Sequence, residues 1–99
     1  MDCKYVTRDM LTHPVIVHVD DEPLNFFSAK ALADRKAKEL SLDPMLVAWF
    51  DRRGGKFSPD VICCDQDKPT WLVYAESRGA DISVDINNED YVFVYKASE

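Results

Sequence analysis

The residues best suited to chemistry are two adjacent cysteines, Cys63 and Cys64, which end an apolar run and are followed at once by Asp65 and Asp67. Cysteines that bind zinc or exchange disulfides are usually two residues apart, because that spacing lets both sulfurs converge on one partner. Adjacent residues of an extended strand point to opposite faces. Since free cysteine also behaves as a small, often buried hydrophobe, the pattern favours the buried end of a strand.

A thiol or metal centre is the alternative, and it needs further ligands. The candidates, all distant in sequence from the cysteine pair, are Cys3, His13 and His18. His18 lies between two valines of a predicted strand and faces opposite to both. No residue marks itself as the group that would orient a Cys–His pair for nucleophilic catalysis. We therefore expect no cofactor and assign no catalytic residue.

The compact basic cluster of the chain is DRRGGK at residues 51–56, in which Arg52, Arg53 and Lys56 flank two glycines. The amides of the glycines would make a crude anion nest. The phosphate-loop spacing is absent, however, and no helix follows whose N-terminus would hold a phosphate. A charged hairpin turn is the simpler interpretation, and its cations would then serve as a docking point for an acidic partner.

The charge is distributed unevenly along the chain. Residues 1–56 carry nine acidic and nine basic side chains, so the whole net charge of −6 comes from residues 57–99. A surface of this sign repels nucleic acids and anionic membranes. There is no apolar run of membrane-spanning length and no signal-peptide pattern, and three cysteines without repeating spacing are no disulfide framework. We expect a cytoplasmic protein that binds neither nucleic acid nor membrane.

One main helix and several strands must position these residues. Ser28 is a good N-cap for AKALADRKAKEL at residues 29–40, where an alanine stripe at helical spacing suits close packing against a sheet. β-Branched and aromatic runs predict strands at residues 15–19, 45–50, 56–64, 71–77, 81–86 and 91–96. The length of 99 residues suits a single domain, residues 1–99.

The C-terminal strands define the predicted fold class. In residues 81–86 Ile82, Val84 and Ile86 face one way, and the polar residues between them face the other. Residues 91–96 are apolar on both faces, which is typical of an interior strand. Short connections favour an antiparallel meander. The sequence therefore predicts an α+β domain: a mostly antiparallel sheet of four to five strands, with a C-terminal meander and one main helix packed on one face.

The segments AWFDRRGGKFSPD, residues 48–60, and VYAESRGADISVDINN, residues 73–88, carry a family resemblance. They resemble a family of small single-domain bacterial proteins catalogued as a domain of unknown function. The resemblance spans most of the chain and implies no reaction, ligand or functional residue.

The aromatic residues of the predicted strands suggest a function. One helix would leave part of the second sheet face uncovered, and exposed apolar area rimmed by charge usually marks a protein contact. We expect a protein-interaction or self-associating module that binds a protein partner or a second copy rather than an enzyme. Its contact residues would be Arg52, Arg53, Lys56, Trp71, Tyr74, Tyr91 and Tyr95. Alternatives are the thiol or metal protein and a small-molecule binding domain or enzyme with a pocket between helix and sheet.

Overall fold

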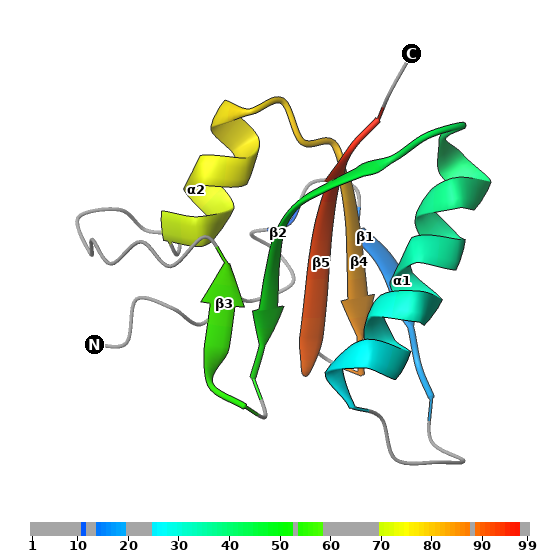
Figure 1. The fold of residues 1–99 in the computed structure, drawn as a ribbon, viewed down its shortest axis with the longest axis vertical. Helices are drawn as coiled ribbons and strands as arrows, with labels where there is room; N and C mark the ends of the chain where they lie inside the picture. Colours follow the sequence, from blue (N-terminus) through cyan, green and yellow to red (C-terminus); the bar gives the residue numbers. More distant parts are fainter. Residues whose placement is uncertain are drawn as a thin grey trace.

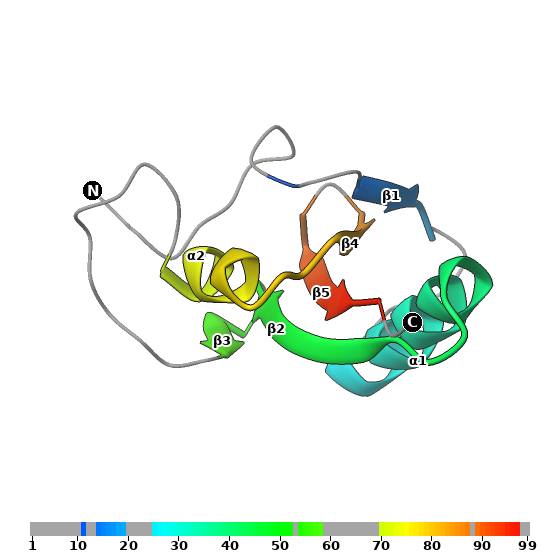
Figure 2. The ribbon, with the colours of Figure 1, turned by 90° about the horizontal axis from the view of Figure 1, so that it is seen from above.

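The fold is a twisted five-stranded sheet with one helix on each face (Figures 1 and 2). The computed structural model describes Leu11 and residues 14–19, 25–52, 54–58, 70–87 and 89–97. The strands are β1 (Pro14–Val17), β2 (Met45–Asp51), β3 (Lys56–Ser58), β4 (Ile82–Ile86) and β5 (Tyr91–Lys96). The helices are α1 (Phe26–Leu40) and α2 (Thr70–Ser77). Neither of these described helices is long and apolar enough to cross a membrane.

The strand order is β1-β4-β5-β2-β3, with β1 parallel to β4 and every other pair antiparallel. The predicted α+β class and mostly antiparallel sheet are confirmed. The interior position of β5 also follows the prediction, because its side chains alternate between two cores. Val92 and Val94 face α2, whereas Tyr91, Phe93 and Tyr95 face α1.

Helix α1 begins three residues earlier than expected. Asn25, not Ser28, is its N-cap: the Asn25 side chain accepts a hydrogen bond from the Ser28 amide, and the Ser28 hydroxyl accepts one from the Asn25 amide. This reciprocal pair is a capping box. The alanine stripe is confirmed, since Ala29, Ala33 and Ala37 are fully buried against β4 and β5. Small side chains let the helix axis approach the sheet closely.

Helix α2 corrects the prediction of a strand at residues 71–77. A short apolar run fits a buried strand or a buried helix equally well, and tertiary packing decides between them. Trp71 and Ala75, one helical turn apart, both face β2 and β5. The Trp71 indole stacks on Phe50, with ring centroids 5.6 Å apart and an interplanar angle of 6°. The meander therefore has two strands rather than three, and a second helix covers the face expected to be open.

Strand β4 also departs from expectation. Ser83 and Asp85, on the polar face of the predicted strand, are buried together with Ile82, Val84 and Ile86. The burial of Asp85 has a local reason: its Oδ1 accepts a hydrogen bond of 2.6 Å from the Glu89 amide. The carboxylate thereby stabilises the β4–β5 turn, in which Asn87 and Glu89 adopt left-handed backbone conformations.

The same turn holds the end of β1. The Asn87 side chain accepts a hydrogen bond from the Val19 amide and donates one to the Val19 carbonyl, and its amide donates to the Val17 carbonyl. These contacts continue the β1–β4 pairing beyond the last residues of both strands. A single asparagine thus fixes an edge strand that is distant in sequence.

Candidate functional site

Three of the predicted contact residues lie inside the molecule. Trp71, Tyr91 and Tyr95 are buried, because each of the two helices covers one sheet face. They belong to the cores and do not form the exposed aromatic face that the sequence suggested. Tyr74 differs from them, since it is half-buried on α2 and lines a surface groove.

The basic hairpin is confirmed as a turn between β2 and β3, with Asp51 paired to Lys56. The Arg52 side chain donates from Nε to the Glu89 carbonyl, and its guanidinium lies 5.7 Å from the centre of the Phe50 ring. Its first role is therefore to hold two turns together. The Gly54 amide donates to the Asp51 carboxylate, so one amide of the less favoured anion nest is already bound to a carboxylate of the same turn. Lys56 is exposed, and Arg53 lies outside the described residues.

The thiol or metal alternative falls mostly outside the described residues, where Cys3, His13, Cys63 and Cys64 all lie. His18 is exposed just after β1. In the described part of the chain, no three histidine, cysteine or acidic side chains are grouped to hold a metal ion. Because four of its five candidate ligands lie outside the described residues, this alternative stays a prediction.

A surface that the sequence did not reveal lies where α1 ends and β2 begins. Leu40, Leu42 and Met45 are 58%, 99% and 58% exposed, and we call these three residues the entrance patch. Leu40 follows Ala37 by three residues, a spacing that would extend the buried stripe of α1, but the helix ends there and Ser41 takes an extended conformation. The sequence feature that could have indicated this surface is the segment from Leu40 to Met45, which joins α1 to β2. It contains two leucines and a methionine, and Pro44 interrupts it.

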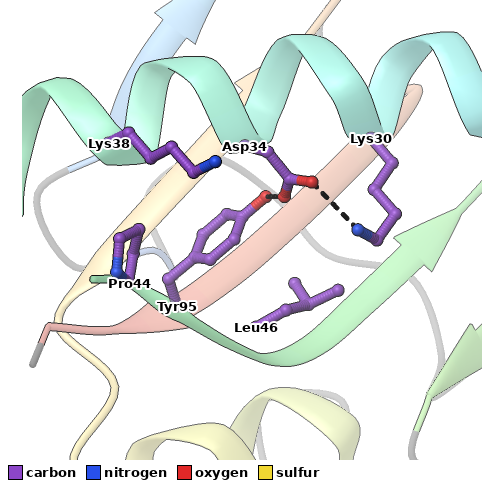
Figure 3. A pocket seen from close by; sticks show the side chains of 6 residues that line it. All are labelled: Lys30, Asp34, Lys38, Pro44, Leu46 and Tyr95. Atoms are coloured by element: carbon purple, nitrogen blue, oxygen red, sulfur yellow. Dashed lines mark hydrogen bonds and ion pairs between the residues drawn. The ribbon is translucent and has the colours of Figure 1, made fainter. Parts of the chain in front are cut away.

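Two depressions flank the patch, and the first lies between α1 and the sheet (Figure 3). This α1 hollow, of about 180 Å³, is lined by Lys30, Asp34, Lys38, Pro44, Leu46 and Tyr95. The Tyr95 hydroxyl rises from β5 and donates a hydrogen bond of 2.5 Å to Asp34 Oδ1. Lys30 Nζ lies 2.9 Å from the other carboxylate oxygen, one helical turn away. The carboxylate is thus held from both sides.

The charged and polar side chains of the α1 hollow are paired with one another. Burial opposes ionisation of Asp34, but hydrogen bonds from Tyr95 and Lys30 and the positive charges of Lys30 and Lys38 outweigh it, so the pKa of Asp34 lies below its usual value. Burial, followed by the contact with Asp34, raises the pKa of Tyr95 far above its usual value. Near neutral pH the phenol is a fixed donor and the carboxylate a fixed acceptor. Efficient proton transfer needs pKa values near the working pH, so this pair is poorly suited to acid–base catalysis.

The second depression, the α2 groove, lies on the other side of β2. It measures about 400 Å³ and is lined by Met45, Leu46, Val47, Tyr74, Arg78 and Lys96. Met45 pairs with Lys96 across the sheet, and α2 contributes Tyr74 and Arg78. The Arg78 guanidinium lies 5.0 Å from the centre of the Tyr74 ring. The groove therefore combines an apolar floor with two cations, and it shares Met45 with the entrance patch.

Comparisons with known proteins agree on the fold and assign no activity. A family model described as a domain of unknown function, DUF5619, matches residues 12–95. An uncharacterised protein of the archaeon Archaeoglobus fulgidus is 36% identical over 64 residues, which span 62% of this chain and 68% of that protein. The crystal structure of AF1514 from the same organism superposes with a TM-score of 0.75 at 24% identity, covering 90% of this chain and 98% of that one. The resemblance to small domains of unknown function is confirmed, although both relatives are archaeal rather than bacterial.

Proposed function

The chain belongs to the DUF5619 family, and we propose that it is a cytoplasmic protein-interaction module that binds another polypeptide through the entrance patch. One observation carries the proposal: three large apolar side chains are exposed within the six residues from Leu40 to Met45. Three cysteines without disulfide spacing support the cytoplasmic setting.

The entrance patch differs from other exposed apolar residues because its three side chains lie close together in the sequence. Phe27 and Ile16 are also exposed, but they lie singly at the start of α1 and on β1. Isolated apolar residues are normal on a protein surface, whereas adjoining ones rimmed by charge usually mark a contact. Around the patch, Lys38 comes from α1 and Lys96 from β5. A partner that covered Leu42 would remove a fully exposed leucine from water, which contributes about 1.5–3 kcal/mol.

The alternative of a small-molecule enzyme finds less support at the α1 hollow, the depression that has a carboxylate in its lining. The α1 hollow, of about 180 Å³, falls below the 300–1,000 Å³ that is usual for ligand pockets. Its one carboxylate is already engaged by Tyr95 and Lys30, and its pKa is shifted away from neutrality.

Site-specific photo-crosslinking tests the proposal. A benzophenone amino acid replaces Leu42, or replaces Arg35 on the exposed side of α1 as the matched control. We expect an adduct with a defined polypeptide, a second copy included, from position 42 and none from position 35. Excess unlabelled protein should compete for the adduct, and excess Leu42→Asp protein should not. Equal labelling from both positions, or no adduct from position 42, would contradict the proposal.

A further inference from the structure

We propose that the α2 groove selects the partner by binding an acidic segment that carries an apolar anchor residue. The anchor lies on Met45, Val47 and Tyr74, and flanking carboxylates pair with Arg78 and Lys96. This inference rests on the proposed function, because it gives the entrance patch a partner of defined chemistry.

The floor of the groove is apolar because of the strand register. Met45 and Lys96 are direct partners at the ends of β2 and β5, and Ala48 pairs with Val94 further along. The register shifts between Leu46 and Ala48, so Val47 lies at an irregularity of the ladder and packs partly against the α2 core. A volume of about 400 Å³ is large enough for ligand-sized apolar groups. The groove is also open, which suits a side chain of an extended segment.

The rim of the groove is cationic. The contact with the Tyr74 ring holds the Arg78 guanidinium in place. Among the described residues, no ion pair joins Arg78 or Lys96 to a carboxylate. Asp81 approaches this end of β5 through its backbone, but its Oδ1 accepts a hydrogen bond from the Ala97 amide. Two cations that make no such pair beside an apolar floor are complementary to acidic residues on either side of an apolar one.

The charge of the whole chain narrows the choice of partner. A net charge of −6 disfavours long polyanions such as nucleic acids, which gain affinity by neutralising many phosphates at once. A short acidic segment needs only the two local cations. The arginine adds directionality, because its planar fork binds a carboxylate through two parallel hydrogen bonds.

The test titrates the isotopically labelled protein with a short peptide of glutamates around a central leucine, followed by NMR. The same peptide with lysine in place of each glutamate is the charge control. We expect amide shifts confined to Met45, Leu46, Val47, Tyr74 and their neighbours with the acidic peptide, and none with the basic one. Equal shifts with both peptides, no shifts in the groove, or stronger binding of a thymidine oligonucleotide would overturn the inference.

Variants distinguish binding in the α2 groove from a general effect of the protein's charge. Replacing both Arg78→Gln and Lys96→Gln should weaken acidic-peptide binding about tenfold, which equals about 1.4 kcal/mol. Arg35→Gln with Lys36→Gln removes the same charge from α1 and should leave binding unchanged. Thermal unfolding of each variant confirms that the fold is intact.

The two proposals fail in different ways. In the first case, position 42 crosslinks a partner, but the Arg78 and Lys96 variant binds that partner and the acidic peptide with the same affinity as the control variant. The groove inference is then wrong and the docking function stands. If the peptide binds in the groove but no crosslink forms at position 42, the contact avoids the entrance patch and the proposed function is wrong in its location.

Discussion

The α1 hollow and the α2 groove lie on opposite sides of β2 and share Leu46, but they differ in how their charges are matched. In the hollow, one carboxylate is bound by a buried tyrosine and a lysine of its own helix. In the groove, the Arg78 guanidinium lies over the Tyr74 ring and Lys96 ends a strand, and neither side chain forms an ion pair with a described residue. A polar group whose partners come from the same chain contributes to the fold, whereas cations beside apolar surface are available to another molecule. The first depression therefore contributes to the fold, and the second is the one that we propose for recognition.

The cores behind the two depressions should respond differently to substitution, and this is the largest expected effect. Trp71→Ala removes the largest buried side chain of the α2 side and should lower the free energy of unfolding by about 3–5 kcal/mol. Ala33→Leu overfills the close α1–sheet contact and should cost about 1–3 kcal/mol. Urea denaturation measures both. A Trp71→Ala variant as stable as the native protein would show that α2 is not an integral layer.

The second effect concerns the matched charges of the α1 hollow. Tyr95→Phe keeps the buried ring but removes the donor to Asp34, which should cost about 1.5–3 kcal/mol, the usual contribution of a hydrogen bond to a charged group. The pKa of Asp34 should rise toward its usual value, as measured by carboxyl NMR titration. Tyr74→Phe is the matched control on the α2 side, and it should change neither quantity.

The same pair predicts how stability depends on pH. Because the pKa of Asp34 is lower in the fold than its usual 3.8, its ionised form stabilises the protein above that value, and this contribution is lost as the pH falls through the folded pKa. Because the pKa of Tyr95 is raised above 10.0, its neutral form stabilises the protein below pH 10, and this contribution is lost as the pH rises further. Urea midpoints against pH should show both limbs, and Tyr95→Phe should flatten the alkaline one.

The smallest effect on stability is expected at the entrance patch. Leu42→Ser changes a side chain that contacts water almost completely, so the free energy of unfolding should move by less than about 0.5 kcal/mol. Partner binding should nevertheless weaken. A large loss of stability would mean that Leu42 is covered within the molecule, and the patch would no longer be a candidate contact.

Much of the fold was predictable because local and tertiary signals agree. In α1 the alanine spacing and the helix-forming composition both indicate one buried face, and Ala29, Ala33 and Ala37 lie there. In β5 the apolar and aromatic run from Tyr91 to Tyr95 indicates burial on both sides, which its central position confirms. Where the signals conflict, the prediction fails. Residues 71–77 are β-prone by composition, but they form a helix whose Trp71 and Ala75 pack in the core with Phe50.

The candidate site was less predictable because it depends on what each element covers. Buried Asp85 looks like a solvated residue until its bond to the Glu89 amide is known. Tyr95 has the same type as any strand tyrosine, and only the register places it beneath Asp34. The entrance patch arises because α1 ends at Leu40, as predicted, but the sequence does not show that Leu40 is left uncovered. Whether a side chain is exposed depends on which elements pack against it in the fold, and the order of residues along the chain does not give that packing.

The junction of β1 with β4 has a consequence for the order of folding. Pro14 pairs with Ser83 and Val17 with Ile86, and the Asn87 side chain bonds Val19 across 68 positions of sequence. Bringing such distant segments together costs more loop-closure entropy than closing the β4–β5 hairpin. We therefore expect the β4–β5 hairpin to form before β1 joins its edge. An edge strand added last is also the first to detach, so the amides of β1 should exchange with solvent hydrogen through local opening long before those of β5 do.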